Sequence, residues 1–598
     1  MRITSFKRCL LAAAVSSGTL PSAFAVSFNI GDIQGQFDST LSIGASWATV
    51  NPDKDLIDVT NGGRGFSSSG DDGRMNFKKG ETFSKIFKGV HDLELNYGDT
   101  RAFVRGKYWY DFELKDENRP FKQISDDGRS MSTRSSGAEF LDAFVAQRYE
   151  IAGRPGDVRL GKQVVSWGES LFIGNSINAI NPLDVVALLR PGSEIKEGLI
   201  PVNMLYVSQG LTDSLSLEGF YQLQWKPYAL PNCGTFFGAD PVPKGCNNNL
   251  NAGLAGVAPL ESIAAAAGLG FGFEDPRIGN EGVIVPRLKD NEPRDSGQYG
   301  MALRWLGDST EYGAYYINYH SRKPKFSLLT ATGVSDFIQN DPNFAALSPD
   351  EQMALGMATG AGNTHYIIDY PENIHLFGLS FATQLPTGTA WSGEISYRPN
   401  EPLSINTADL FGGALNPTFR ALTGSDVEPT VPAEEGQLLQ GWKRKEVTQA
   451  QTTFLHVFDP LLGADSMSLA AEFGVTHIGG LESLDKQRYG RDSVFGDIVQ
   501  GGRHGYYTQT SWGYRAYSAL KYTNVFAGIN LTPNLGWSHD VDGYGPTFNE
   551  GAKAVSLGLD ADYRNTYTAS LSYTNYFGGD FNTDIDRDYV SLSLGVNF

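Results

Sequence analysis

Residues 101–114 read RAFVRGKYWYDFEL, and this stretch decides the fold. From Ala102 to Leu114, every second residue is apolar, aromatic or glycine. The alternate positions carry the charges Arg101, Arg105, Lys107, Asp111 and Glu113. Successive side chains of a strand point to opposite faces, so these charges share one face. An arginine or lysine facing lipid near the midplane would cost about 2–4 kcal/mol. The pattern therefore predicts a strand of an all-β transmembrane barrel, with its charged face toward a hydrated lumen.

The same alternation recurs along the chain and predicts further lumen-facing charges: Glu218, Arg304, Glu394, Arg398 and Arg515. Both signs are present, so the charges either pair across the lumen or form a separate basic ladder that favours anions. The same parity predicts inward-facing aromatic residues: Phe103, Trp109, Phe144, Phe220, Tyr316 and Tyr517. These rings either form a stacking track for sugars or ring compounds, or pack against loops that enter the barrel.

Short and long connections alternate between the expected strands. Short joints fall at residues 98–100, 153–156, 210–213, 307–310, 386–388 and 564–565, and long polar segments at 115–137, 226–296, 321–372 and 399–443. This is the plan of an antiparallel outer-membrane barrel, with short periplasmic turns and long extracellular loops. We expect about 18 strands in one domain, residues 26–598, with an uncertainty of two because residues 160–167 and 204–209 fit either parity poorly. A barrel of this size can enclose an aqueous channel.

Both ends of the chain carry marks of export to the outer membrane. Residues 1–25 have a basic start, a short apolar core and an Ala-Phe-Ala end, which predicts a cleaved signal peptide. The last residues alternate and end in phenylalanine, and they resemble the final-strand signal read by the barrel-assembly machinery: Val590, Leu592, Leu594, Val596 and Phe598. We expect outer-membrane lipid and lipopolysaccharide as the surroundings.

Charge and cysteine content restrict the function further. Without the signal, 45 Lys and Arg stand against 67 Asp and Glu, a net charge of −22, which argues against a nucleic-acid partner. Cys9 leaves with the signal, while Cys233 and Cys246 remain in one loop-rich segment of an exported chain. An oxidising compartment favours a structural disulfide between them; two free thiols are the alternative.

The segment 171–201 is unusually apolar for an external loop. It contains Leu171-Phe172-Ile173 and Leu188-Leu189, whose exposure to water would be costly. We predict that this segment folds into the lumen and narrows it, with Arg190, Glu194 and Lys196 near the constriction. A lid packed on the outer rim is the alternative.

Three short runs carry a family resemblance. RLGKQ at 159–163, SWGES at 166–170 and INPLD at 180–184 resemble signatures of an uncharacterised proteobacterial outer-membrane family, common in pseudomonads and known only as a domain of unknown function. The similarity covers nearly the whole mature chain. The GKQ and WG run is also similar, over a shorter stretch, to anion-selective porins. The resemblance supplies no substrate or catalytic residues. It implies envelope efflux or transport proteins as partners, and with them traffic of organic solutes.

These observations predict a porin-like channel for passive diffusion of small organic solutes, without a cofactor, a metal or catalytic residues. A scaffold or adhesin that presents large loops is the main alternative, and an outer-membrane hydrolase is another. The eight histidines are scattered, and the sequence has neither a G-x-S-x-G elbow nor an H-E-x-x-H helix. A short helix is expected at 257–268, around the alanine run 264–267. Monomers and porin-like trimers both fit the sequence.

Overall fold

The structure is a computed structural model that describes residues 26–247, 249–252, 278–279, 281–425, 431–496 and 502–598. The expected signal peptide at 1–25 and the expected helix at 257–268 lie outside these residues. None of the described helices is long and apolar enough to cross a bilayer.

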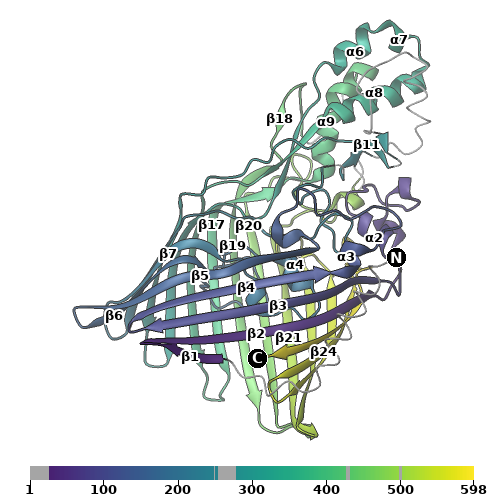
Figure 1. Cartoon of the computed structure of the whole chain (residues 1–598). Coiled ribbons are helices and arrows are strands. Elements are labelled where there is room, and N and C mark those ends of the chain that lie inside the picture. Colours follow the sequence, from purple (N-terminus) through teal and green to yellow (C-terminus); the bar gives the residue numbers. More distant parts are fainter. Residues whose placement is uncertain (1–25, 248, 253–277, 280, 426–430, 497–501) are drawn as a thin grey trace.

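Eighteen antiparallel strands form a closed barrel (Figure 1). They are β2 (Ile33–Ala48), β3 (Thr82–Tyr97), β4 (Thr100–Asp111), β5 (Ser136–Ile151), β6 (Arg154–Gln163), β7 (Val202–Gly210), β8 (Leu215–Gln222), β12 (Gln298–Leu306), β13 (Thr310–Tyr319), β16 (Ile374–Gln384), β17 (Ala390–Ser404), β19 (Trp442–Phe458), β20 (Ser466–Gly479), β21 (Thr510–Phe526), β22 (Ile529–Asp542), β23 (Lys553–Tyr563), β24 (Tyr567–Phe577) and β25 (Tyr589–Asn597). The last strand closes the circle on β2, with Thr40 opposite Asn597 and Ala48 opposite Tyr589. A short strand, β1 (Val26–Ile30), pairs with the start of β2. The predicted barrel and its strand number are confirmed.

The two ends of the barrel differ as the sequence predicts. At the turn end, neighbouring strands are joined by short connections, such as the two residues 98–99 between β3 and β4. At the loop end, long connections carry further elements, and several of their helices project well beyond the strands (Figure 1). The strands of the loop end are β9 (Asn251–Ala252), β10 (Ile278–Gly279), β11 (Gly282–Ile284), β14 (Lys325–Leu329), β15 (His365–Asp369) and β18 (Leu438–Leu439).

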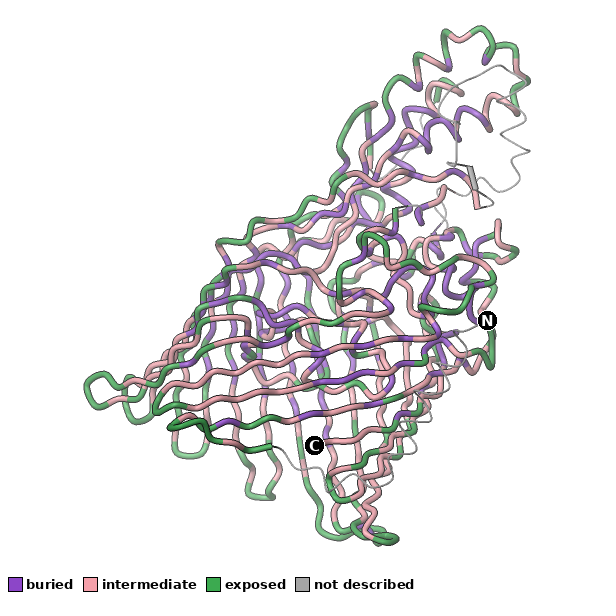
Figure 2. The backbone as a smooth tube through the Cα atoms, in the orientation of Figure 1, coloured by how far each residue is buried: buried purple, intermediate pink, exposed green. Residues whose placement is uncertain are grey.

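Short helices also belong to the long connections. The α-helices are α2 (Asp72–Asn76), α3 (Phe112–Asp116), α4 (Val185–Leu189), α6 (Val334–Asn340), α7 (Pro342–Ala345), α8 (Pro349–Asn363) and α9 (Thr407–Thr423). The 3-10 helices are η1 (Lys54–Leu56), η2 (Val59–Asn61), η3 (Met131–Thr133), η4 (Ile195–Glu197) and η5 (Ser493–Phe495). Buried residues are frequent among these loops, whereas the connections at the turn end are mostly exposed (Figure 2). A disulfide between Cys233 and Cys246 links two points of the β8–β12 loop, which confirms that pairing.

The outer face of the barrel is apolar along its strands. Leu379, Phe473 and Leu557 are 60%, 45% and 52% exposed, and each lies on the parity opposite to the lumen-facing residues of its strand. A continuous apolar surface of this kind is stable against hydrocarbon but not against water.

Aromatic residues gather near both ends of this apolar face. Near the loop end, Tyr316 contacts Tyr299 and Phe377 on neighbouring strands. Near the turn end, Trp305 stacks on Tyr312 with ring centroids 5.3 Å apart. Trp305 lies six positions after Tyr299 on β12, which corresponds to about 20 Å along the strand at 3.3 Å per residue. This spacing fits the two interfacial girdles of a barrel with an apolar band about 25 Å tall.

Three residues do not lie where the alternation places them. Glu113 is not on β4, because Asp111 ends the strand and caps helix α3 by accepting the backbone N–H groups of Glu113 and Leu114. Tyr316 faces outward, and its neighbour Tyr315 faces the lumen. The alternation of residues 215–225 predicts that Trp225 faces lipid, but it follows the end of β8 and is buried in a loop, where its indole N–H donates to the carbonyl of Ser321.

Candidate functional site: a loop across the lumen

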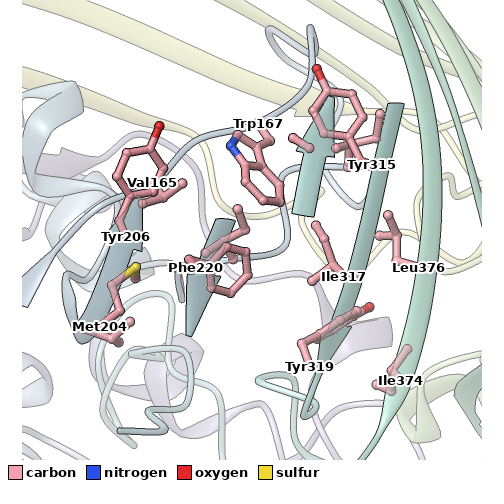
Figure 3. Packing of buried hydrophobic residues seen from close by; sticks show 14 residues of the cluster. Val165, Trp167, Met204, Tyr206, Phe220, Tyr315, Ile317, Tyr319, Ile374 and Leu376 are labelled. Atoms are coloured by element: carbon pink, nitrogen blue, oxygen red, sulfur yellow. The ribbon is translucent and has the colours of Figure 1, made fainter. Parts of the chain in front are cut away.

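The connection between β6 and β7, residues 164–201, is here called the lumen loop. Its first part packs against the inside of the barrel wall, where Trp167, Ile177 and Ile180 are completely or almost completely buried. Their side chains meet apolar residues that β7, β8, β12, β13 and β16 direct inward (Figure 3). These wall residues are Val202, Met204, Tyr206, Phe220, Ala302, Tyr315, Ile317, Tyr319, Ile374 and Leu376. The apolar lining explains why residues 204–209 fit neither parity clearly.

Two buried wall carboxylates hold the backbone of the lumen loop. Glu472 on β20 is 0% exposed and accepts the N–H groups of Leu171 at 2.9 Å and of Phe172 and Ile173 at 2.6 Å. Glu394 on β17 accepts the N–H groups of Glu169, Ser170 and Ile177, with the last two at 3.1 and 3.3 Å. Hydrogen bonds to an ionised acceptor are about twice as strong as neutral ones. The loop is therefore fixed to β17 and β20 through main-chain groups.

Side chains of β17 and β19 bind carbonyl oxygens of the loop. Arg398 donates to the carbonyl oxygens of Asn175 and Ser176, and the second distance is 2.9 Å. Gln449 and Gln451 on β19 donate to Gly174 and Ile173, at 2.8 and 3.2 Å.

The later part of the lumen loop contacts the opposite wall. Asp184 pairs with Lys107 of β4 at 2.9 Å, and Glu197 pairs with Lys88 of β3. All four side chains are at most 4% exposed. Strands β3 and β17 stand nine places apart in the circle of 18, so the loop crosses the barrel from one side to the other. Removing one partner from such a buried pair leaves an uncompensated charge and costs about 3–5 kcal/mol.

The three residues predicted near a constriction lie on this later part. Arg190 is covered: its guanidinium lies 4.5 Å from the Trp109 ring and donates to the carbonyl oxygens of Ser132 and Arg134. Glu194 and Lys196 pair with each other at 3.0 Å and are partly exposed. The residue between them, Ile195, is 94% exposed.

The predicted lumen-facing charges on the strands pair mostly with close neighbours. Arg105 binds Asp92 through two hydrogen bonds of 2.7 and 2.8 Å. Arg304 pairs with Glu218 at 2.8 Å, and Glu218 also accepts the indole N–H of Trp167 at 2.7 Å. Arg515 pairs with Asp540 at 2.6 Å. The Arg101 guanidinium lies 5.7 Å from the centroid of the Phe144 ring, and the Ser84 hydroxyl donates a hydrogen bond of 2.5 Å to Asp111.

Glu113, outside the strand, pairs with Lys85 and Arg119 at the loop end. The sequence did not single out Lys88, Asp184 or Glu197. Lys88 shares the parity of Asp92 on β3, and Asp184 ends the INPLD run, so both had a weak local signal.

The wall of β22 to β25 is lined differently from the rest. Most of its inward positions carry small polar residues or glycine: Asn534, Gly536, Ser538, Ser556, Gly558, Ser570, Ser572, Thr574, Ser591 and Ser593. Asp540, Asp560 and Asp562 have the same inward parity. The loop meets this wall at Gly192, which lies beside Ser593 of β25 and Ser42 of the adjoining strand β2. Leu171 and Phe172 of the loop are 54% and 40% exposed inside the barrel. A polar wall thus stands beside a loop with accessible apolar side chains.

One acidic cluster lies among the loops. Carboxylate oxygens of Asp71, Asp72 and Glu281 lie within 4.8 Å of one another. Lys122 already pairs with Asp72 at 3.0 Å and with Glu281 at 3.5 Å, so we assign no metal ion to this cluster. Burial raises the pKa of Asp71 to about 7, despite the hydrogen bonds that Asn61 and the Asp58 N–H donate to it.

Comparison with solved structures finds matches over almost the whole chain at low similarity. OccAB1 of Acinetobacter baumannii matches with 9% identity and a TM-score of 0.38, over 97% of this chain and 99% of that one. OpdK of Pseudomonas aeruginosa, solved with vanillate, matches with 9% identity and a TM-score of 0.36, over 94% and 98%. A BenF-like porin of Pseudomonas fluorescens matches with 8% identity and a TM-score of 0.39, over 95% and 98%. We draw nothing further from likenesses of this size.

Comparison with sequences gives a clearer result. No curated protein matches the chain. A family model described as a protein of unknown function, DUF1302, matches residues 7–598, almost the entire sequence. The chain therefore belongs to the DUF1302 family.

Proposed function

We propose that the protein is an outer-membrane channel through which small organic solutes diffuse passively. The observation that carries this proposal is the lining of the lumen, where the lumen loop fills one part and leaves the polar wall of β22 to β25 uncovered. The apolar girdled exterior supports insertion in a bilayer, and the long-loop end would then face the outside of the cell.

The lining supports organic solutes rather than ions alone. Ser, Thr and Asn side chains of β22 to β25 offer hydrogen bonds to polar groups, and Leu171, Phe172 and Ile195 offer apolar contact from the loop. Most of the lumen charges listed above are already paired, so few are available to dominate selection by charge. Passage needs neither catalysis nor a cofactor.

Single-channel recording in planar bilayers tests this function. The purified mature chain should produce discrete conductance steps, and liposomes that contain it should swell in solutions of small neutral organic solutes. Bilayers that receive only detergent are the control. Folded protein that inserts into the bilayer without conducting would contradict the proposal.

A loop-presenting scaffold has one observation in its favour. Residues of helices α6 to α9 form apolar clusters of their own beyond the barrel. One of these clusters packs around Phe344 of α7 and Leu355 of α8. Such a unit can present a surface whether or not the barrel conducts. The absence of conductance in the recordings would leave this scaffold as the better proposal.

A further inference from the structure

A cavity of 490 Å³ lies where six connections of the loop end meet. One residue from each connection illustrates the convergence: Leu56, Val242, Phe326, Ile405, Val494 and Arg587. The β2–β3 and β24–β25 connections come from one side of the barrel and the β13–β16 connection from the other. Since these connections start at the loop end and come from opposite walls, the cavity lies across the loop end of the lumen.

Arg587, which lines this cavity, shares its nearest carboxylate with Arg74, and its guanidinium also lies 5.1 Å from the Phe236 ring. Arg587 is 3% exposed, and its Nε lies 3.7 Å from the carboxylate of Asp586. That carboxylate is already bound by the Nε of Arg74, at 2.8 and 3.0 Å, and by the N–H of Asp53 at 3.1 Å. Within the described part of the chain, the Nη1 of Arg587 has no hydrogen-bond partner. A buried guanidinium in this state gains free energy by binding an anion.

Among the described residues, the other carboxylates of the lining, Asp240, Asp492 and Asp584, form no ion pair with Arg587. Asp492 uses its carboxylate to accept the N–H of Val494 at 2.9 Å. Burial raises the pKa of Asp584, against the lowering effect of the nearby Arg587 and Arg74, and burial raises the pKa of Asp240 well beyond its ordinary value. Burial, together with the nearby Arg74, lowers the pKa of Arg587 to about 9, so its charged form still predominates at neutral pH.

The other side of the cavity is apolar. Leu56 and Leu250 are 1% and 3% exposed, and Phe326 and Phe237 also line the space. The volume lies in the range of pockets that enclose small organic molecules.

We propose that this cavity is an entry site that binds organic anions, with the carboxylate of the solute on Arg587 and its hydrocarbon part against the apolar side. The inference rests on the proposed channel function and narrows its substrate class. Two parallel N–H groups of a guanidinium match the two oxygens of a carboxylate, which a simple halide does not reproduce.

Isothermal titration of the detergent-solubilised protein at pH 7 tests the site, with hexanoate and hexylammonium as probes of the same length and opposite charge. Hexanoate should bind at least about tenfold more tightly than hexylammonium, because the free charged group of the cavity is positive. The Arg587→Gln variant should weaken hexanoate binding by roughly tenfold or more, and Arg587→Lys should restore part of it. The matched control is Arg420→Gln, which removes a guanidinium of helix α9 that pairs with Glu434. This variant should bind hexanoate as the wild type does.

The possible outcomes distinguish a failure of the entry-site proposal from a failure of the channel proposal. Equal binding of the two probes, tighter binding of hexylammonium, or an unaltered Arg587→Gln variant would overturn the entry site even if the protein conducts. Binding of hexanoate that depends on Arg587, in a protein that gives no conductance, would keep the site and reject the channel. If Arg587→Gln does not fold, the two probes on the wild-type protein still decide.

Discussion

The carboxylate of Glu472 on β20 accepts the backbone N–H of Ile173 at 2.6 Å, although the two residues are 299 positions apart in the sequence. The same carboxylate also accepts the N–H groups of Leu171 and Phe172, so one side chain fixes three consecutive residues of the lumen loop. The position of the loop inside the barrel therefore depends on a barrel-wall residue and not on the loop sequence alone.

Replacing Glu472 should loosen the loop without unfolding the barrel. In Glu472→Gln, the negative charge is lost. The NH₂ group that replaces one carboxylate oxygen cannot accept hydrogen bonds from the backbone N–H groups that it faces. Because hydrogen bonds to charged groups contribute about 1.5–3 kcal/mol, the amides of residues 171–173 should exchange with deuterium roughly tenfold faster or more. Hydrogen exchange with mass spectrometry checks this. Glu446→Gln, at an exposed position of β19, is the control, and equal protection in both variants would contradict the role of Glu472.

The apolar side of the lumen loop should contribute strongly to stability. Trp167 is 1% exposed and contacts the rings of Phe220 and Tyr315. Trp167→Ala leaves a cavity and removes the indole N–H that donates to Glu218, and it should lower the free energy of unfolding by about 3–5 kcal/mol. Urea unfolding in detergent, followed by circular dichroism, measures the change. Trp512→Ala, on the outer face, should cost clearly less; equal losses would show that Trp167 is not a packing centre.

The barrel was predictable from the sequence because period-two alternation is local. A charge such as Arg105 identifies its face with no knowledge of its partner, and this holds for most strands. The alternation weakens where β7 turns Met204 and Tyr206 inward against the lumen loop, a contact between segments that no local pattern encodes. Glu113 was misplaced because Asp111 ends its strand by capping a helix, which alternation does not reveal.

The candidate site was predictable only in part, for a similar reason. The apolar content of residues 171–201 indicated a loop that needs cover, but not which side chains hold it. The sequence predicted that Glu394 faces the lumen, among charges that either pair across it or form a separate basic ladder, and Glu472 has the same inward parity. In the structure, both accept main-chain N–H groups of the loop. Backbone partners have no signature in sequence, so this part of the site needed the fold.

Acid should stabilise the loop between β2 and β3. Burial raises the pKa of Asp71 in the folded chain to about 7, whereas an exposed aspartate titrates near 3.8. The contribution of a raised pKa is complete below the unfolded value and is lost as the pH rises through the folded value. The amide of Asp58, which donates to Asp71 at 2.9 Å, should thus be best protected near pH 4 and progressively less so up to pH 8.

Hydrogen exchange corrected for intrinsic rates measures this trend. In Asp71→Asn, an amide oxygen still accepts the hydrogen bond but no longer titrates, so the trend should disappear. A loop with the same pH dependence in both proteins would assign the effect to other groups, such as the neighbouring Glu281.

The disulfide should stabilise its loop and not the barrel. Cys233 and Cys246 enclose 13 positions of sequence, for which loop-closure entropy gives about 3 kcal/mol at most. In the double variant Cys233→Ser and Cys246→Ser, a protease should cut within residues 223–297 sooner than in the wild type. The heat-resistant mobility of the folded barrel on a gel should stay the same. Loss of the folded band would mean that barrel assembly itself depends on this bond.

Ile195 offers the sharpest test of the passage. Its side chain is 94% exposed, and it lies between Glu194 and Lys196 on the part of the lumen loop that Glu197 fixes to Lys88 inside the barrel. Because the side chain is solvated, Ile195→Trp should change the free energy of unfolding by no more than about 0.5 kcal/mol. The larger indole should nevertheless lower the single-channel conductance, and Ile195→Gly should raise it. Leu462→Trp, at a 76% exposed position of the β19–β20 turn outside the lumen, is the matched control and should conduct as the wild type does. Equal conductance of all four proteins would mean that solutes do not pass beside this part of the loop.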